Sequence, residues 1–357
     1  MEPNSGMFTA AATVLCALIP PPGESRSRAS GAFCIRCSKA ALLLVVALAG
    51  AFAAHGQEAQ ASEQKQQPAV NAAGEPTKAL PPFRLPGGVI LESDLTYAQY
   101  GTRELKLDLY RPASGSGPFP GVVFIHGGAW MTGTKAGFSR EAAYLATKGY
   151  VCVSIDYRMS PEAPYPAALF DSKAAVRWMR ANAAKYKIDS NRIAASGGSA
   201  GGQLVALLGT TGDVRTMEGD GGNPQYSSRV QAVAAFNPAT DFVSLLPRTQ
   251  KPDVVIPAVT KFLGGTQDQV PEIYVEASPV THVSATSPPF LFLHGTADTT
   301  LPYRQSLEMQ SALQAVGVRA ELYSAKDANH GFFNYPPFYE PSIERVQQFL
   351  DSVFDKH

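Results

Sequence analysis

The sequence lacks a surplus of charge of either sign. Its 30 Lys and Arg residues balance 30 Asp and Glu residues, so the formal net charge is zero. No run of basic residues stands out either, and a protein that binds the phosphate backbone of nucleic acid needs a basic surface. We therefore expect no nucleic-acid partner and no positively charged surface that would attract polyanionic substrates.

Cysteine is scarce beyond the amino terminus. Cys16, Cys34 and Cys37 lie close to the amino terminus, and Cys152 is the only later cysteine. Cys34 and Cys37 have the spacing of a metal or redox pair, but no second pair is present to complete a tetrahedral site. We therefore expect no metal site and no disulfide in the mature chain. Cys152, inside an apolar run, is interpreted as a small buried side chain.

The chain also lacks an apolar run of full membrane-spanning length near its amino terminus. Residues 40–54 form an apolar stretch of about 15 residues, whereas a bilayer-spanning helix needs about 20. Arg36 and Lys39 precede this stretch, and small residues and then polar Gln57 follow it, which is the order of a secretory signal peptide. We expect residues 1–54 to be a cleaved leader and the mature protein to be exported, periplasmic or extracellular, with no membrane span; an uncleaved anchor is the alternative.

The rest of the chain divides by composition into a linker and one domain. Residues 55–80 are rich in Gln, Glu, Ala and Pro and have little to bury, which predicts a disordered linker. Residues 81–357 alternate apolar runs with amphipathic segments, which predicts an α/β fold with a mostly parallel central sheet of about eight strands flanked by helices. Residues 241–286 contain five prolines and interrupt the alternation, so we interpret them as a small cap insertion.

The expected elements follow from the spacing of apolar residues. Alternating segments predict an antiparallel edge hairpin at 95–100 and 105–110. Continuous apolar runs predict central strands, and a last strand is expected near the carboxyl end: 121–125, 151–155, 192–196, 230–236, 290–293 and 319–324. Amphipathic spacing predicts helices at 139–148, 168–186, 200–208, 304–316 and 341–355.

A glycine-rich motif identifies the candidate nucleophile. Gly197-Gly198-Ser199-Ala200-Gly201 fits the pattern G-x-S-x-G, in which a serine projects from a sharp turn between a strand and a helix. The motif follows the strand expected at 192–196 and opens the helix expected at 200–208, so its context agrees with its pattern. Ser199 is therefore the predicted catalytic nucleophile; a glycine-rich turn with an idle serine is the alternative.

A second glycine-rich segment, His126-Gly127-Gly128-Ala129-Trp130, follows the strand expected at 121–125. Backbone N–H groups in such a loop stabilise the oxyanion that forms when a nucleophile attacks an ester. We expect the oxyanion hole to consist of the N–H groups of Gly128, Ala129 and Ala200. His126 is interpreted as a structural residue of the loop, because the catalytic base comes last in this order of elements.

The base and its acidic partner are expected after the last two strands. His330 follows the final strand, and a histidine can accept the serine proton at neutral pH. Asp298 follows the preceding strand and would orient the imidazole, while Asp327 remains a rival because it is close to His330 in sequence. The order Ser199, Asp298, His330 is that of α/β-hydrolases.

The motifs together resemble a known family. The stretches 126–130, 156–158, 160–166, 171–178 and 197–202 are similar to bacterial esterases of the BD-FAE-like group and to the neighbouring hormone-sensitive-lipase family. The resemblance covers about residues 90 to 355 and implies an α/β-hydrolase fold, no cofactor, and carboxylesterase, acetylesterase or feruloyl-esterase activity. One departure is Ala129, which replaces the third glycine of the lipase-type loop and implies a narrower pocket.

The resemblance also assigns roles to residues around the site. Trp130 and Gly127 are expected in the substrate pocket, with core packing as the alternative for Trp130. Glu162 and Asp156 are expected to support the active-site loops through Arg158, unless they form ordinary surface ion pairs. The acidic loop 213–223 is interpreted as a polar turn rather than a calcium site, because its spacing fits no dedicated calcium loop.

The predicted function is hydrolysis of small-molecule carboxylic esters with short acyl chains, acetyl or feruloyl esters among them, through an acyl-enzyme. Two alternatives remain open. One is a serine peptidase of the prolyl-oligopeptidase type, although such chains carry a large extra domain and the stretch before this hydrolase is short. The other is an inactive hydrolase fold used for binding. The sequence determines neither the natural substrate nor the oligomeric state.

Overall fold

The computed structural model describes residues 80–355. The leader expected at 1–54 lies outside the described residues, and so does the linker expected at 55–80 except for Leu80. The described residues belong to a single compact unit.

The described domain is built on one eight-stranded sheet with the order β1-β2-β4-β3-β5-β6-β7-β8. β2 pairs antiparallel with β1 and β4, and all other neighbours pair parallel. The strands are β1 Val89–Tyr100, β2 Arg103–Pro112, β3 Phe119–Ile125, β4 Val151–Ile155, β5 Ile188–Gly198, β6 Ala232–Phe236, β7 Phe290–Gly295 and β8 Ala320–Ala325. The prediction of a mostly parallel sheet of about eight strands with an edge hairpin is confirmed.

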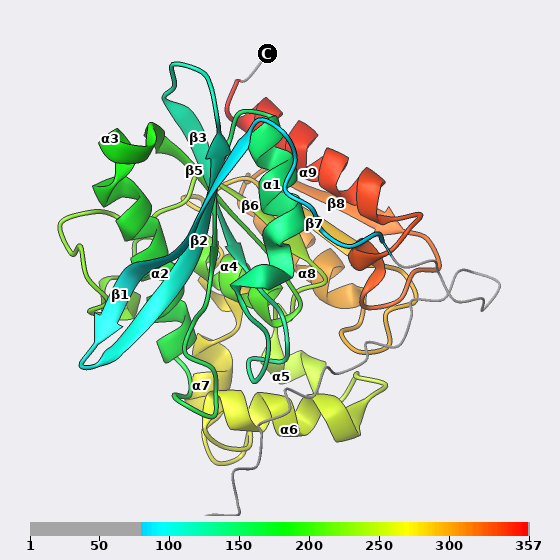
Figure 1. Cartoon of the computed structure of the whole chain (residues 1–357). Coiled ribbons are helices and arrows are strands. Elements are labelled where there is room, and N and C mark those ends of the chain that lie inside the picture. The colour runs from blue at the N-terminus through cyan, green and yellow to red at the C-terminus, as the bar shows by residue number, and fades with distance from the viewer. Residues whose placement is uncertain (1–79, 356–357) are drawn as a thin grey trace, which may run out of the picture. The chain divides into compact units, whose positions relative to one another are not determined.

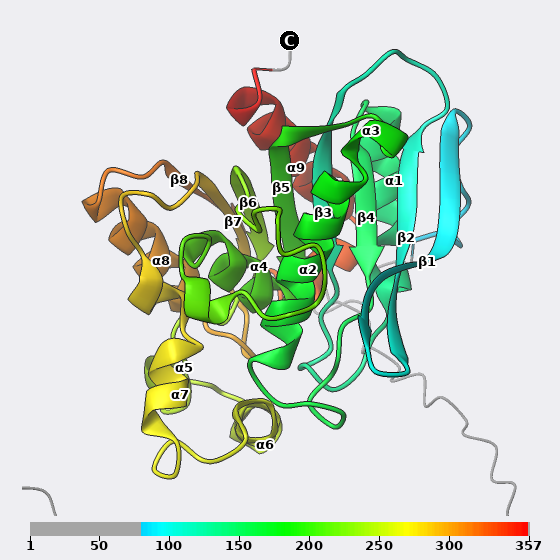
Figure 2. The same ribbon diagram turned by 90° about the vertical axis from the view of Figure 1, so that its left-hand side faces the viewer.

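Helices cover both faces of this sheet, which is why its central strands are continuous apolar runs (Figures 1 and 2). Along β3, Val122 and Phe124 join one buried cluster while Val123 and Ile125 join the other, as the twofold side-chain period of a strand requires. The first cluster packs on α1 (Ser139–Thr147) and α9 (Tyr339–Val353), and the second on α2 (Ala167–Ala181), α4 (Ala200–Thr210) and α8 (Arg304–Ala315).

The helix expected at 168–186 is divided in the structure. α2 ends at Ala181, and a separate turn of helix, α3, runs over Ala183–Tyr186. Asn182 lies between them, and its side-chain amide donates to the carbonyl of Trp178 at 2.9 Å. Asparagine side chains compete in this way with the backbone bonds that would continue a helix. Short 3-10 turns complete the described part at Lys135–Phe138, Arg215–Met217, Pro279–His282 and Phe332–Asn334.

Residues 241–286, expected to be a cap, form three helices and one of the 3-10 turns. The helices are α5 (Phe242–Leu245), α6 (Pro252–Leu263) and α7 (Pro271–Glu276). Pro252 and Pro271 each begin a helix, where a missing N–H costs nothing and the fixed φ of proline suits the first turn. Figures 1 and 2 show these helices gathered at one end of the sheet, next to the point where β6 ends. Two of the prolines that interrupt the sequence pattern are thus helix starts.

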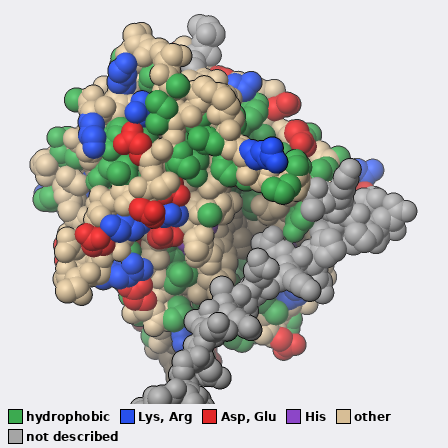
Figure 3. Space-filling model, in the orientation of Figure 1, with side chains coloured by type: hydrophobic (Ala, Val, Ile, Leu, Met, Phe, Trp, Pro, Cys, Tyr) green, Lys and Arg blue, Asp and Glu red, His purple; other side chains and the backbone are tan. Residues whose placement is uncertain are grey.

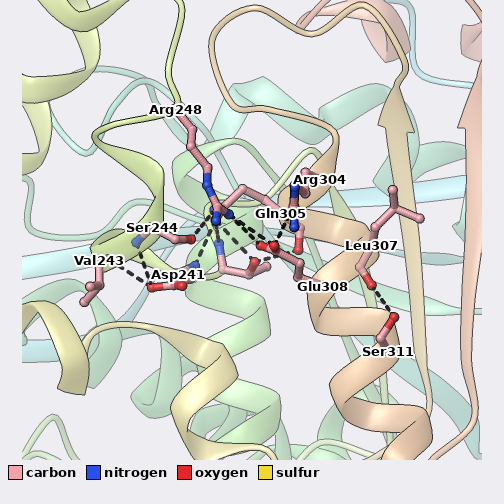
Figure 4. A network of polar contacts seen from close by, with 10 residues as sticks. Asp241, Val243, Ser244, Arg248, Arg304, Gln305, Leu307, Glu308 and Ser311 are labelled. Atoms are coloured by element: carbon pink, nitrogen blue, oxygen red, sulfur yellow. Dashed lines mark hydrogen bonds and ion pairs between the residues drawn. The ribbon is translucent and has the colours of Figure 1, made fainter.

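A polar network fixes the start of this segment to α8 (Figure 4). The side-chain oxygen of Gln305 accepts the backbone N–H groups of Thr240 and Asp241 at 2.8 and 2.9 Å. Gln305 is 1% exposed, so these bonds are shielded from water. Arg248 and Glu308 add an ion pair at 3.1 Å across the same junction. The side-chain amide of Gln305 therefore holds the start of this segment to α8.

Replacing Gln305 by leucine is expected to lower the free energy of unfolding by about 2 kcal/mol, because two buried N–H groups lose their acceptor. Chemical denaturation followed by circular dichroism measures this. The matched control is Glu308→Gln, which breaks the exposed ion pairs of Glu308 with Arg248 and Arg304 and should cost less than about 1 kcal/mol. Equal losses in the two variants would contradict the role given to Gln305.

The surface of the described part shows no segregation of charge on the face drawn in Figure 3, where basic and acidic side chains lie intermixed. Within residues 80–355, none of the helices has the length and apolar character that crossing a membrane would require.

Candidate active site

Ser199 lies at the sharp turn between β5 and α4. Its φ of 57° and ψ of −119° place its backbone in a region that residues other than glycine rarely adopt. Its N–H donates to the carbonyl of Phe236 on the neighbouring strand at 2.9 Å, which holds this strained turn in place. A Cβ at Gly201 would overlap the carbonyl oxygen of Ile125, so the motif needs glycine there. The predicted strand–turn–helix context is confirmed.

The structure brings Ser199, His330 and Asp298 into one hydrogen-bonded chain. The Oγ of Ser199 lies 2.8 Å from Nε2 of His330, and Nδ1 of His330 lies 2.7 Å from Oδ2 of Asp298. The three residues follow the carboxyl ends of β5, β8 and β7, which meet at one edge of the parallel sheet. The Asp298 side chain is fully buried, and that of His330 is 24% exposed. A substrate could therefore reach the histidine while the carboxylate stays dry.

Four nitrogen atoms contact the carboxylate of Asp298. Its Oδ1 accepts the backbone N–H groups of Thr300 and Leu301 at 2.9 and 3.0 Å. Its Oδ2 contacts Nε2 of His294 at 3.2 Å as well as His330. Burial by itself raises the pKa of Asp298, but the charge and hydrogen bonds of His330 and His294 outweigh burial and hold that pKa well below its usual range. The carboxylate therefore stays ionised beside His330.

Asp327, the rival for this position, lies elsewhere. Its side chain is exposed, and its backbone N–H donates to Oγ1 of Thr296 at 2.8 Å. No hydrogen bond or ion pair joins it to His330 in the described part of the chain. The geometry thus favours Asp298 as the partner of His330.

The three predicted oxyanion donors belong to the turn after β3 and to the first turn of α4. Gly128 and Ala129 have φ values of 113° and 55°, and the carbonyl of Gly128 accepts the N–H groups of Met131 and Thr132, both at 3.0 Å, which closes the loop into a tight turn. Between residues 80 and 355, the N–H groups of Gly128 and Ala129 have no backbone acceptor. Ala200 is the first residue of α4, where N–H groups have no partner inside the helix. These donors are available to an anion.

Gly127 places this loop against the nucleophile. A Cβ at Gly127 would come 3.3 Å from Cβ of Ser199 and 2.8 Å from the carbonyl oxygen of Gly198. The loop therefore approaches the β5–α4 turn more closely than a side chain at this position would allow.

His126 has the surroundings of a structural residue. It is 2% exposed, stacks on Tyr157 with ring centroids 4.4 Å apart, and its Nδ1 lies 2.7 Å from the carbonyl of Gly127. Burial lowers its pKa, with smaller opposing contributions from the Gly127 carbonyl and from Asp156. Within residues 80–355 it forms no hydrogen bond with Ser199, and its contacts are with the scaffold of the loop.

Trp130 joins the glycine-rich loop at 126–130, called the oxyanion loop below, to the cap. Its ring stacks on Phe262 of α6 with centroids 4.5 Å apart, and its Nε1 donates to Gln203 at 3.1 Å. Gln203 in turn donates to the carbonyl of Ala277 at 2.9 Å. Trp130 is only 4% exposed. Most of its surface therefore packs against protein, as the core-packing alternative expects, and little of the ring is left to contact a substrate.

The expectation that Arg158 connects Glu162 and Asp156 is wrong. Arg158 pairs instead with the fully buried Asp171 of α2, with Nη2 and Oδ1 2.8 Å apart, while Glu162 pairs with Arg103 at 2.8 Å. The reason is burial, because the Asp171 carboxylate is removed from water and needs a charged hydrogen-bond donor. Arg158 supplies that donor. Asp156 accepts the backbone N–H of Lys135 at 2.7 Å, so it supports the segment after the oxyanion loop directly.

The acidic loop at 213–223 uses its carboxylates within the protein. Glu218 accepts from the buried Lys173 and Arg177 at 2.9 and 3.0 Å, and Asp213 pairs with Arg229. In the described range, no group of three or more His, Cys, Asp and Glu side chains is arranged to hold a metal ion.

Sequence reasoning missed Asn237, which follows β6. Its side-chain nitrogen lies 3.1 Å from Nδ1 and 3.3 Å from Nε2 of His330. Because Asp298 and Ser199 already engage both ring nitrogens, an amide nearly equidistant from them must lie over the ring or at its Cε1 edge. Asn237 is fully buried and has a positive φ of 33°. The only sequence signal was its position directly after a central strand, beside the strand that carries Ser199.

Asn237 is therefore expected to position the imidazole of His330. Replacing it with alanine should lower kcat by about 10- to 100-fold with little change in KM, because a small displacement of a reacting group has effects of this size. Steady-state kinetics on 4-nitrophenyl acetate measure both parameters, and the circular dichroism spectrum should be unchanged. A kcat within about twofold of the parent value would rule out a positioning role.

Several known proteins are similar to this chain in sequence and in fold. The BD-FAE family model matches residues 107–313. A probable carboxylic ester hydrolase, LipM of Mycobacterium tuberculosis, is 35% identical over 242 residues, which cover 65% of this chain and 54% of that protein. The chain thus spans about half the length of the curated relatives LipM and LipC.

Two solved structures extend the comparison. Thermogutta terrifontis esterase 2 phosphonylated by sarin aligns with a TM-score of 0.66 and 30% identity, over 76% of this chain and 97% of that one. A truncated carbohydrate esterase from gut microbiota aligns with a TM-score of 0.66 and 26% identity, over 75% and 97% of the two chains. Together with the family match, which spans more than half of the residues, they show that the chain belongs to the BD-FAE family and has the α/β-hydrolase fold.

Proposed function

We propose that this protein hydrolyses carboxylic esters through an acyl-enzyme on Ser199. The observation that carries the proposal is the chain of hydrogen bonds from Ser199 through His330 to Asp298, at 2.8 and 2.7 Å. The similarity to LipM and to the Thermogutta esterase supports the same chemistry.

In the acylation step, Oγ of Ser199 attacks the ester carbonyl while Nε2 of His330 takes its proton. The imidazolium that forms is stabilised by the ionised Asp298, which contacts Nδ1. The carbonyl oxygen becomes an anion, and the N–H groups of Gly128, Ala129 and Ala200 are the donors proposed to hold it. Collapse of this intermediate breaks the bond to the alcohol, which leaves with the proton from His330.

In the second step, water replaces the alcohol. His330 removes a proton from the water, hydroxide adds to the acyl carbonyl, and the same N–H groups hold the second oxyanion. Collapse releases the carboxylic acid and returns the proton to Oγ of Ser199. His330 carries every proton transfer in this cycle, and the backbone N–H groups only donate hydrogen bonds to the two oxyanions.

We further propose that the acyl group is short. Trp130 and Phe262 pack together between the oxyanion loop and the cap, which limits the room for a long chain at that boundary. Initial rates on 4-nitrophenyl acetate, butyrate and octanoate and on methyl ferulate test this. We expect the acetate and butyrate to have higher kcat/KM than the octanoate; a preference for octanoate would overturn the proposal.

Two further assays separate this function from its alternatives. A fluorophosphonate probe should modify Ser199, as located by mass spectrometry of the labelled peptide, whereas a binding protein with an inactive site would remain unlabelled. A peptide amide assayed beside the ester should be cleaved far more slowly. Faster cleavage of the amide would favour a serine peptidase.

We also propose that the protein is exported. The basic residues, apolar stretch and small residues before Gln57 support this, although they lie outside the described residues. Expression of the full chain in a bacterial host should give a mature amino terminus close to residue 55, found by peptide mass spectrometry of the periplasmic fraction. A full-length chain confined to the cytoplasm would contradict export.

A further inference from the structure

The carboxylate proposed to orient His330 has a second histidine against it. His294 lies at the end of β7 and is fully buried, and its Nε2 is 3.2 Å from Oδ2 of Asp298. The same oxygen lies 2.7 Å from Nδ1 of His330. Two imidazole rings therefore share one carboxylate oxygen, although the reaction described above uses only one of them.

The surroundings of His294 determine which of its nitrogens carries a hydrogen. Nε2 lies 2.9 Å from the carbonyl oxygen of Leu301 as well as 3.2 Å from Asp298. A carbonyl and an ionised carboxylate only accept hydrogen bonds, so Nε2 must be protonated and donate to them. Nδ1 lies 2.8 Å from Oγ of Ser306, a hydroxyl that can donate or accept. His294 is therefore an N–H donor to Asp298 whether its ring is neutral or charged.

These contacts close a circuit around the carboxylate. The N–H of Leu301 donates to Oδ1 of Asp298 at 3.0 Å, while the carbonyl of Leu301 accepts from His294. Ser306, which is also fully buried, holds the other side of the His294 ring from α8. Turning the carboxylate would break hydrogen bonds on both of its oxygens. The loop after β7 and the start of α8 therefore help to set where Oδ2 lies in front of His330.

His294 also limits the negative charge that His330 meets. A donor bonded to Oδ2 draws part of the charge of that oxygen away from the other ring. Burial raises the pKa of Asp298, and the charge of His330 and then the hydrogen bond from His294 lower it. A carboxylate that attracted the imidazolium too strongly would keep His330 protonated near neutral pH. The ring could then not accept the proton of Ser199.

Few other groups that could alter this balance face the two rings. The ring of Tyr303 meets that of His294 edge-on, with centroids 5.6 Å apart. From α8 the group that faces His294 is a neutral hydroxyl, and from the end of β6 the neutral amide of Asn237 faces His330. Within residues 80–355, Asp298 is the one carboxylate bonded to either histidine. A change at His294 should therefore reach His330 through Asp298.

We propose that His294 is a positioning residue in the reaction. By donating to Oδ2 it holds the carboxylate of Asp298 toward Nδ1 of His330 and sets the pH at which that ring can accept a proton. This role rests on the proposed ester hydrolysis, because it concerns the base of that reaction. Without the donor, Oδ2 would hold the imidazolium more strongly, and the acid side of the pH–activity profile would move to higher pH.

Two amide substitutions separate the two nitrogens of the His294 ring. The amide of His294→Gln reaches about as far as Nε2 and can still donate to Asp298, whereas that of His294→Asn reaches only about as far as Nδ1. For His294→Asn we expect the acid-side midpoint of kcat/KM on 4-nitrophenyl acetate to rise by about 0.5 to 1 pH unit. At about pH 7 its kcat should fall by about tenfold, with KM within about twofold of the parent. For His294→Gln the midpoint should stay within about 0.2 pH unit of the parent.

The control for loosened packing is Gln305→Leu. Gln305 is as deeply buried as His294, and it precedes Ser306 on α8 (Figure 4). Its side chain bonds to the start of the cap segment and, within the described residues, not to Asp298. This variant should melt at a lower temperature than the parent and keep the parent midpoint. A shift as large as that of His294→Asn would mean that weaker packing, and not a lost donor, moves the profile, and would overturn the proposal.

A second measurement does not depend on turnover. In the Ser199→Ala background, the resonance of the Cε1–H group of His330 can be followed by NMR as the pH changes, in protein with labelled histidine. Adding His294→Asn should move the titration midpoint of this resonance upward by about 0.5 to 1 pH unit, and adding His294→Gln should not. A midpoint that moves equally in both variants would reduce His294 to a packing residue. Because His294→Gln alone can contradict the proposal, the test does not require His294→Asn to fold.

The two proposals fail in different ways. If the parent does not hydrolyse 4-nitrophenyl acetate, the proposed function is wrong, and the NMR titration still decides whether His294 acts on His330. If the parent is active but neither midpoint moves in His294→Asn, only the role given to His294 is wrong.

Discussion

Replacing Ser199 by alanine should lower kcat/KM for 4-nitrophenyl acetate by about 10⁴-fold or more and leave the fold intact. The substitution removes the only atom that can form the acyl-enzyme, while the oxyanion donors and the binding surface remain. Residual turnover would then come from water attacking the bound ester. Steady-state assays at several enzyme concentrations measure the kcat/KM of the variant. Circular dichroism and thermal melting check that it folds.

A neighbouring serine provides the matched control. Ser196 lies on β5, just before the turn that carries Ser199. It is fully buried, and its hydroxyl has no hydrogen-bond partner in the part of the chain described. Ser196→Ala removes the same atom three residues earlier and should retain at least about half of the parent kcat/KM. If both variants retained activity, Ser199 would not be the nucleophile and the acyl-enzyme mechanism would be wrong.

The sequence was sufficient to predict the arrangement of Ser199, Asp298 and His330 because the sheet is parallel. Each residue follows an apolar run, and the carboxyl ends of parallel strands meet at one edge whatever the length of the chain between them. The order of the three along the chain then assigned their roles. Local pattern and topology were enough, and no side-chain contact had to be known.

Contacts between side chains could not be predicted in the same way. Arg158 has several acidic residues nearby in sequence, but it pairs with Asp171 because α2 brings a fully buried carboxylate beside it. Asn237 lies against His330 because β6 and β8 end at the same edge of the parallel sheet, although the two residues are 93 positions apart. Glu141 looks like an ordinary residue on the surface of an amphipathic helix. Only the packing around α1 shows that it is buried.

Replacing Asp298 by asparagine should lower kcat by about 10⁴-fold, the second largest effect expected. Asparagine has nearly the same shape, and the backbone N–H groups of Thr300 and Leu301 keep an acceptor when its amide oxygen occupies the position of Oδ1. Its amide would, however, present either a neutral oxygen or an N–H group to Nδ1 of His330. In the first case the imidazolium loses its counter-charge, and in the second the ring is held with its proton on Nε2, where it cannot accept the proton of Ser199.

The same substitution changes how stability depends on pH. The folded-state pKa of Asp298 lies below the value of an unfolded aspartate, so the ionised carboxylate stabilises the folded protein above the ordinary aspartate pKa of about 3.9. That stabilisation is lost as the pH falls through the lower, folded-state pKa. Asp298→Asn should therefore be less stable than the parent at pH 7, and the difference should shrink in acid. Urea denaturation at about pH 7 and about pH 3 measures it.

Asp327→Asn is the control that distinguishes the two candidate acids. Asp327 is even closer to the base in the linear sequence, but its side chain is exposed and it is its backbone that bonds to Thr296. We expect this variant to keep a kcat within about twofold of the parent, because no charge beside His330 is removed. The reverse pattern, with activity lost at 327 and kept at 298, would mean that His330 is oriented by the later carboxylate. The loop after β8 would then have to rearrange during catalysis to bring that carboxylate to the ring.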